Sequence, residues 1–138
     1  MTDVAYVALG SNLGNRERAL DRARTAIAAI RDTVITAETP IEETEPIGPQ
    51  PQGRYLNQMI AVTTGLPPHT LLAALHRIER AAGRARASRW GPRTLDLDIV
   101  MIEGQNISDD SLNVPHPELN NRDFWQRQLA LLRGSVDG

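Results

Sequence analysis

The sequence predicts an α+β fold, a ferredoxin-like βαββαβ sandwich in which helices pack on an antiparallel sheet. Two observations predict it: four β-rich runs alternate with two amphipathic helical stretches in the order β-α-β-β-α-β, and 41% of the residues are hydrophobic, enough for one core. Neither a repeat nor a linker divides the 138 residues. We therefore expect one domain over residues 1–138, ending in a short helical tail.

The first half of the chain reads as strand, helix and strand. Residues 4–9 are a β-rich run that stops at Gly10, and residues 10–15 form a turn that offers several helix caps. Over residues 16–30 apolar side chains recur every three or four positions with arginines between them, which predicts an amphipathic helix. Residues 33–39 are the second expected strand.

The second half repeats the pattern after a long connection. Residues 40–54 hold four of the nine prolines, which predicts an ordered loop and no regular element. Residues 55–64 are expected to form a strand, and residues 67–83 a helix that begins at two prolines and ends at a glycine. Residues 94–102 are the fourth expected strand, and a last helix is expected near 121–132.

Composition excludes several classes of protein. There is no cysteine, so disulfides and thiol chemistry are excluded. All 15 basic residues are arginine, which excludes a P-loop lysine and means that guanidinium groups would bind any phosphate. The net charge of −2 argues against a nucleic-acid partner, and no apolar run approaches the ~18 residues of a membrane span. We expect a cytoplasmic monomer.

The most informative segment is residues 89–98, where an arginine-bearing turn leads into a strand. Side chains alternate along a strand, so Asp96 and Asp98 point to one face with their Cα atoms roughly 6.5 Å apart. A bare Asp-x-Asp is most often a solvated strand face. The rigid Gly91-Pro92 turn between cations favours the other interpretation, in which the carboxylates bind Mg²⁺ together with substrate phosphates.

Other residues admit both a structural and a functional interpretation. The Gly10–Gly14 turn is either a helix cap or a site where backbone N–H groups meet phosphate. His116 lies between two prolines and is either a surface histidine or a ligand. Asn57 is a poor β former that suits hydrogen bonding to a flat ligand, and Phe124 with Trp125 is more often a core pair than a binding platform.

Together these segments resemble the 6-hydroxymethyl-7,8-dihydropterin pyrophosphokinase family of the folate pathway. The matching segments occur in family order and cover about residues 4–124. They are Leu9-Gly-Ser-Asn-Leu-Gly14, Thr44-Glu-Pro-Ile-Gly-Pro49, Tyr55-Leu-Asn57, Ile78-Glu79 with Gly83-Arg84, Arg89-Trp-Gly-Pro-Arg-Thr-Leu-Asp-Leu-Asp98, and Val114-Pro-His-Pro117 with Arg122.

The resemblance implies transfer of a pyrophosphoryl group from ATP to the pterin hydroxymethyl oxygen, leaving AMP. It implies that Asp96 and Asp98 hold two Mg²⁺ ions and that Arg84 and Arg93 stabilise the transition state. The residues it places on the nucleotide side are Glu79, Arg86, Arg89, Trp90, Arg93, Ile99, His116 and Arg122. Those it places on the pterin side are Thr44, Ile47, Tyr55, Asn57 and Phe124.

The tail departs from the family pattern. Residues 123–129 are more polar than the family sequence and lack its proline, so the resemblance does not predict how the tail packs against the pterin side. Two other classes of protein are alternatives. A ferredoxin-like nucleic-acid module is disfavoured by the net charge and by the 4% aromatic content. A metal-dependent phosphohydrolase would need a residue to activate water, and the sequence offers no obvious one.

Overall fold

The computed structural model describes residues 2–45, 53–83 and 95–137. Their elements, in chain order, are β1 (Asp3–Ser11), α1 (Arg16–Ala28), β2 (Thr33–Glu38), β3 (Glu42–Thr44), β4 (Tyr55–Thr64), α2 (Pro68–Ala81), β5 (Asp96–Ile102), β6 (Ile107–Ser108), β7 (Asn113–Val114), a 3₁₀ turn (Leu119–Asn121) and α3 (Asp123–Asp137). No helix in these ranges is long and apolar enough to cross a membrane.

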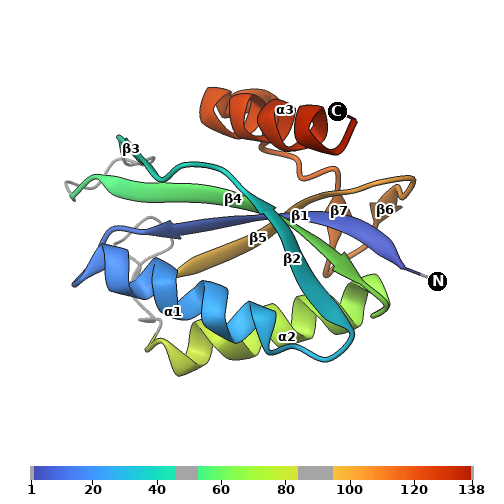
Figure 1. The fold of residues 1–138 in the computed structure, drawn as a ribbon, viewed down its shortest axis with the longest axis horizontal. Helices are drawn as coiled ribbons and strands as arrows, with labels where there is room; N and C mark the ends of the chain where they lie inside the picture. Colours follow the sequence, from blue (N-terminus) through green and yellow to red (C-terminus); the bar gives the residue numbers. More distant parts are fainter. Residues whose placement is uncertain (1, 46–52, 84–94, 138) are drawn as a thin grey trace.

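An antiparallel sheet forms the centre of the molecule, with strands in the order β2-β4-β1-β5 and β3 paired to the beginning of β4. Helices α1 and α2 lie on one face of the sheet and α3 on the other (Figure 1). Alternation along β1 explains the two faces. Val7 and Leu9 pack toward α1 and α2, whereas Tyr6 and Ala8 pack in the cluster that contains Trp125 of α3.

The side-chain register places three strands side by side at the C-terminal end of β1. Gly10 of β1 pairs with Asn57 of β4 on one side and with Asp96 of β5 on the other. Ala8 pairs with Asp98. The two aspartates therefore lie on the face that α3 covers in part. The register brings Gly10 next to residues that are 47 and 86 positions further along the chain.

Two hydrogen-bonding groups, Tyr6 of β1 and Arg133 of α3, meet at Glu103 and join α3 to the sheet. The buried Tyr6 hydroxyl donates to Glu103 Oε2 at 2.9 Å, and Arg133 of α3 donates to both oxygens of Glu103 at 2.9 and 3.1 Å. Burial and then the Glu103 carboxylate raise the pKa of Tyr6 to about 12.

In the β6–β7 turn the Ser111 and Leu112 N–H groups donate to Asp109, which lowers the pKa of that carboxyl to about 2.

Most expected elements are confirmed, with corrected ends. The first helix starts after Asn15, whose side chain accepts from the Arg18 N–H at 3.1 Å, and it stops at Ala28, two residues early. The last helix starts at Asp123 and not at 121, because a 3₁₀ turn occupies Leu119–Asn121.

Two strand features were not predicted. The expected loop over 40–54 contains β3, and the β6–β7 hairpin is formed by two-residue strands. Strands this short carry no hydrophobic period, so sequence patterns do not reveal them.

Candidate active site

The two aspartates lie beside small residues of β1. Along the face that they share, β1 side chains shrink from Tyr6 to Ala8 to Gly10. The space above Gly10 is filled by side chains of β4. A Cβ at this position would lie 3.2 Å from Asn57 Oδ1 and 3.3 Å from a Tyr55 ring carbon. Glycine therefore lets the β4 side chains lean over β1 toward the carboxylates.

The carboxylates are half-buried and have polar neighbours from other elements. The Tyr55 hydroxyl lies 3.4 Å from Asp96 Oδ2, and His116 Nε2 lies 3.7 Å from Asp98 Oδ1. No cluster of three or more metal-binding side chains occurs within the described ranges. Two carboxylates on one strand face nevertheless suit Mg²⁺, because Mg²⁺ commonly takes one or two carboxylates and completes its octahedron with waters and substrate phosphates.

Glu79 of α2 supports the strand that carries the pair. Its carboxylate is buried, at 3% exposure, and accepts the Leu97 N–H at 2.7 Å. Leu97 lies between the two aspartates on the edge strand of the sheet, so a backbone donor that would otherwise be left at a sheet edge is satisfied by a charged acceptor. The contact fixes the backbone between Asp96 and Asp98.

His116 is fixed from three directions. Its N–H donates to the Val100 carbonyl at 2.8 Å, and its Nδ1 accepts the Glu118 N–H at 3.0 Å. Because Nδ1 is an acceptor, the neutral imidazole carries its proton on Nε2, the atom that faces Asp98. The ring also packs edge-on against Trp125, with centroids 4.9 Å apart.

Trp125 also makes a contact with Arg122. The Arg122 guanidinium lies 4.3 Å from the centre of its ring, within the range of a cation–π interaction. Arg122 Nε is buried and has no hydrogen-bond partner in the described part of the chain. Trp125 itself is 2% exposed, which confirms the core interpretation for this residue, and Phe124 packs against it at 6.3 Å.

On the β3–β4 side, Asn57 is oriented by Thr44. The Asn57 Nδ2 group donates to Thr44 Oγ1, so its Oδ1 turns toward Gly10. Asn57 is 7% exposed and Tyr55 is half-buried. The amide thus presents a fixed donor and acceptor pattern beside the aspartates, which suits recognition of a flat heterocycle with amide-like edges.

Comparison with known proteins shows the family to which the chain belongs. The sequence matches the profile of 7,8-dihydro-6-hydroxymethylpterin-pyrophosphokinase (HPPK) over residues 6–133. The chain belongs to the HPPK family.

Individual HPPK-type proteins align over most of the chain. It is 41% identical over 137 residues to a 2-amino-4-hydroxy-6-hydroxymethyldihydropteridine pyrophosphokinase of Bacillus subtilis, covering 99% of this chain and 82% of that protein. A protein of the same name from Haemophilus influenzae is 41% identical over 120 residues, 87% of this chain and 75% of its own. A mitochondrial folate synthesis bifunctional protein of Arabidopsis thaliana is 40% identical over 132 residues, which are 94% of this chain but 23% of the plant protein.

The structure brings many of the HPPK-like residues together. Thr44, Tyr55, Asn57, Asp96, Asp98 and His116 are linked by the contacts above, and Arg122 and Phe124 join them through Trp125. Six other predicted residues lie outside the described ranges: Ile47, Arg84, Arg86, Arg89, Trp90 and Arg93. Ile99 is 2% exposed in the core beneath α1 and α2, so any nucleotide contact that it makes must come from its backbone.

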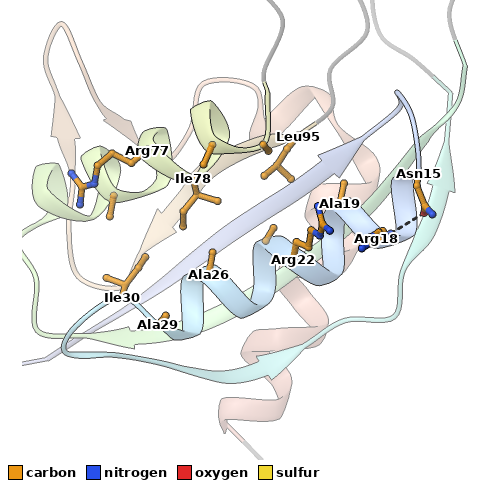
Figure 2. A pocket seen from close by; sticks show the side chains of 14 residues that line it. Asn15, Arg18, Ala19, Arg22, Ala26, Ala29, Ile30, Arg77, Ile78 and Leu95 are labelled. Atoms are coloured by element: carbon orange, nitrogen blue, oxygen red, sulfur yellow. Dashed lines mark hydrogen bonds between the residues drawn. The ribbon is translucent and has the colours of Figure 1, made fainter.

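A separate groove lies in the helical layer of this HPPK-family chain. It has a volume of about 590 Å³ and runs between α1 and α2, with alanines on its floor and Arg18, Arg22 and Arg77 around it (Figure 2). None of the predicted site residues lines it. The groove therefore lies apart from the aspartate face. The candidate active site is identified by the side chains around Asp96 and Asp98 and not by this groove.

Three residues beside the predicted site were not predicted as site residues. Glu42 of β3 accepts from Arg127 and Gln128 of α3 at 2.6 and 3.1 Å. The sequence did mark Arg127 and Gln128 as unusual, because they lie in the segment that is more polar than the family pattern. It did not mark Glu42, since Glu42 lies in a stretch that was expected to be a loop.

Proposed function

We propose that this chain transfers the pyrophosphoryl group of ATP to the hydroxymethyl oxygen of 6-hydroxymethyl-7,8-dihydropterin. The bond between the β-phosphorus and the oxygen that bridges to the α-phosphate breaks, a bond to the pterin oxygen forms, and AMP leaves. The observation that carries the proposal is that Asp96 and Asn57 flank Gly10 on the two neighbouring strands, so that a carboxylate pair and an oriented amide share one face of the sheet.

Asp96 and Asp98 are the proposed ligands of two Mg²⁺ ions. When bound, the ions would neutralise the charge of the triphosphate. The chain's own contribution is to hold the two carboxylates in place: Glu79 fixes the backbone between them, and the Tyr55 hydroxyl and His116 Nε2–H lie beside their outer oxygens. Such a pre-set arrangement is what phosphoryl transfer demands of a protein.

The remaining residues divide between the two substrates. We assign the nucleotide to His116 and Arg122, with Glu79 and Ile99 as neighbours, and to Arg86, Arg89, Trp90 and Arg93 of the undescribed segment. Arg84 and Arg93 are proposed to stabilise the transition state. Thr44, Ile47, Tyr55, Asn57 and Phe124 are assigned to the pterin. The fixed Nε2–H tautomer makes His116 a donor, which suits a phosphate or a carboxylate oxygen.

Fold, location and assembly are proposed in the same way. The strand order β2-β4-β1-β5, with α1 after β1 and α2 after β4, is that expected of the ferredoxin-like sandwich, with β3 as an addition. We propose one domain over residues 1–138 that works as a cytoplasmic monomer.

The identity of the nucleotide product tests the function. Purified protein is incubated with Mg²⁺, ATP and 6-hydroxymethyl-7,8-dihydropterin, and the products are separated by ion-exchange chromatography. We expect AMP and pterin diphosphate in equal amounts. Formation of ADP would indicate a simple kinase, and release of inorganic phosphate without the pterin would indicate a phosphohydrolase.

A further inference from the structure

The strand that carries Thr44 is tied to α3 by a polar contact. Arg127 Nη2 donates to Glu42 Oε1 at 2.6 Å, and Gln128 Nε2 donates to Glu42 Oε2 at 3.1 Å. The two donors are consecutive residues of α3, so one carboxylate is held by both of its oxygens. We refer to Glu42, Arg127 and Gln128 as the α3–β3 clamp.

β3 is a short strand at the margin of the sheet. It is three residues long, and within the described ranges its strand partner is β4. Strands of this length are not stable by themselves, and glutamate is depleted in strands. On the opposite face Glu43 pairs with Arg16 at 3.1 Å and with Arg54 at 3.6 Å. The clamp is the matching tether on the face where the aspartates lie.

The position of β3 determines the orientation of Asn57. Glu42 and Asn57 are cross-strand partners, and Thr44, two residues further, supplies the oxygen that accepts the Asn57 amide. A shift of β3 would remove that acceptor and allow the amide to rotate. Rotation would exchange the donor and the acceptor that Asn57 presents, and so invert the hydrogen-bond pattern offered to a ligand.

The choice of glutamine at 128 supports a positional role. Gln128 is 1% exposed, its Nε2 reaches Glu42, and its Oε1 has no hydrogen-bond partner in the described part of the chain. A buried amide with an unsatisfied oxygen destabilises a fold relative to an apolar side chain of similar size. The hydrogen bond from Gln128 to Glu42 is therefore the interaction that offsets this cost.

We propose that the α3–β3 clamp positions Thr44 and Asn57 for the pterin, so that the unusual polar tail of this chain sets pterin affinity without touching the substrate. The inference rests on the proposed function, since it assigns Thr44 and Asn57 to the pterin. Its three members are positioning residues. Their loss should weaken pterin binding and leave nucleotide binding unchanged.

The test compares the double variant Arg127→Gln/Gln128→Leu with wild type. Dissociation constants are measured by calorimetry for α,β-methylene-ATP with Mg²⁺, and then for 6-hydroxymethyl-7,8-dihydropterin added to that complex, which cannot turn over. The matched control is Arg133→Gln, because Arg133 lies on the same helix and pairs with a carboxylate, Glu103, at the other end of the sheet. Gln128→Leu alone is included because it places an apolar group in the core and should not lower the melting temperature.

We expect the double variant to bind the pterin about fivefold more weakly, the scale of a lost tether of this kind, with the nucleotide constant changed by less than about twofold. The control should bind both ligands as wild type does. Equal pterin affinity in wild type and the double variant would overturn the positioning role of the clamp and leave the proposed function standing. If both ligands bind more weakly by the same factor, or if the control loses the same pterin affinity, the cause is general destabilisation. Either result would also overturn the positioning role. Failure of wild type to bind the pterin would overturn the proposed function itself.

Discussion

Replacing Glu79 by alanine would remove the support behind the aspartate pair. The buried carboxylate accepts the Leu97 N–H at 2.7 Å, in the middle of the strand segment that carries Asp96 and Asp98. Alanine cannot reach this donor, and the vacated space lies inside the layer between α2 and β5. Glutamine keeps the side-chain length and offers a carbonyl oxygen that can still accept, so the two variants separate the hydrogen bond from the volume.

The magnitude follows from the contact. A hydrogen bond to a charged acceptor contributes about 1.5–3 kcal/mol to stability, and the lost methylene adds about 1 kcal/mol, partly offset by relief from burying a charge. We therefore expect Glu79→Ala to lower the free energy of unfolding by about 3 kcal/mol and Glu79→Gln by about 1 kcal/mol. For a chain of this length these values correspond to losses of roughly 9 °C and 3 °C in melting temperature.

Urea denaturation followed by circular dichroism measures these differences. Glu38→Ala is the control, because Glu38 is exposed at the end of β2 and its loss should change stability by no more than about 0.5 kcal/mol. At a temperature where Glu79→Ala is folded, its turnover should fall about tenfold or more, because the strand between the aspartates is no longer fixed. A stability loss below about 1 kcal/mol for alanine, or equal losses for alanine and glutamine, would refute this account of Glu79.

Three further predictions concern Gly10, the loss of stability at alkaline pH and the metal. Gly10→Ala should raise the KM for the pterin about tenfold with the KM for ATP unchanged, because its Cβ would meet Asn57 and Tyr55; Gly134→Ala, which has open space, should change neither constant. Since the folded pKa of Tyr6 is raised to about 12 from 10.0, its contribution to stability is complete below pH 10 and is lost between pH 10 and 12. Urea titrations should show this loss at about 1.4 kcal/mol per pH unit in wild type, while Tyr6→Phe shows none from this position, and identical slopes would contradict the assignment. EDTA should abolish turnover and excess Mg²⁺ should restore it, whereas turnover that survives EDTA would argue against a metal-dependent reaction.

The sequence predicts those parts of the molecule that follow from periodicity. Alternation places Asp96 and Asp98 on one face and Leu97 on the other, and the structure confirms that arrangement, with Leu97 in the core. The amphipathic helices and their order predict that α1 and α2 lie on one face of the sheet, and the structure places them there. Asn57 stands out because a polar side chain in a buried strand requires a partner, and the structure supplies Thr44.

Features that depend on contacts between distant segments are beyond such patterns. The contact of Glu79 with Leu97 joins a helix to a strand edge 18 residues away, and the clamp joins Glu42 to α3 across 85 and 86 residues. Neither leaves a local period or motif. The β3 strand is missed for the same reason, because its pairing and its ion pairs come from β4, α1 and α3 and not from its own sequence.

The most direct test of the central claim, that Asp96 and Asp98 hold the metal ions of the reaction, is a count of bound ions. Mn²⁺ replaces Mg²⁺, and electron paramagnetic resonance measures free Mn²⁺ in the presence of α,β-methylene-ATP. We predict two ions for each wild-type chain with nucleotide, and loss of at least one in Asp96→Ala and in Asp98→Ala, with turnover abolished and the circular dichroism spectrum unchanged. Two ions bound as tightly in both variants as in wild type would contradict the account.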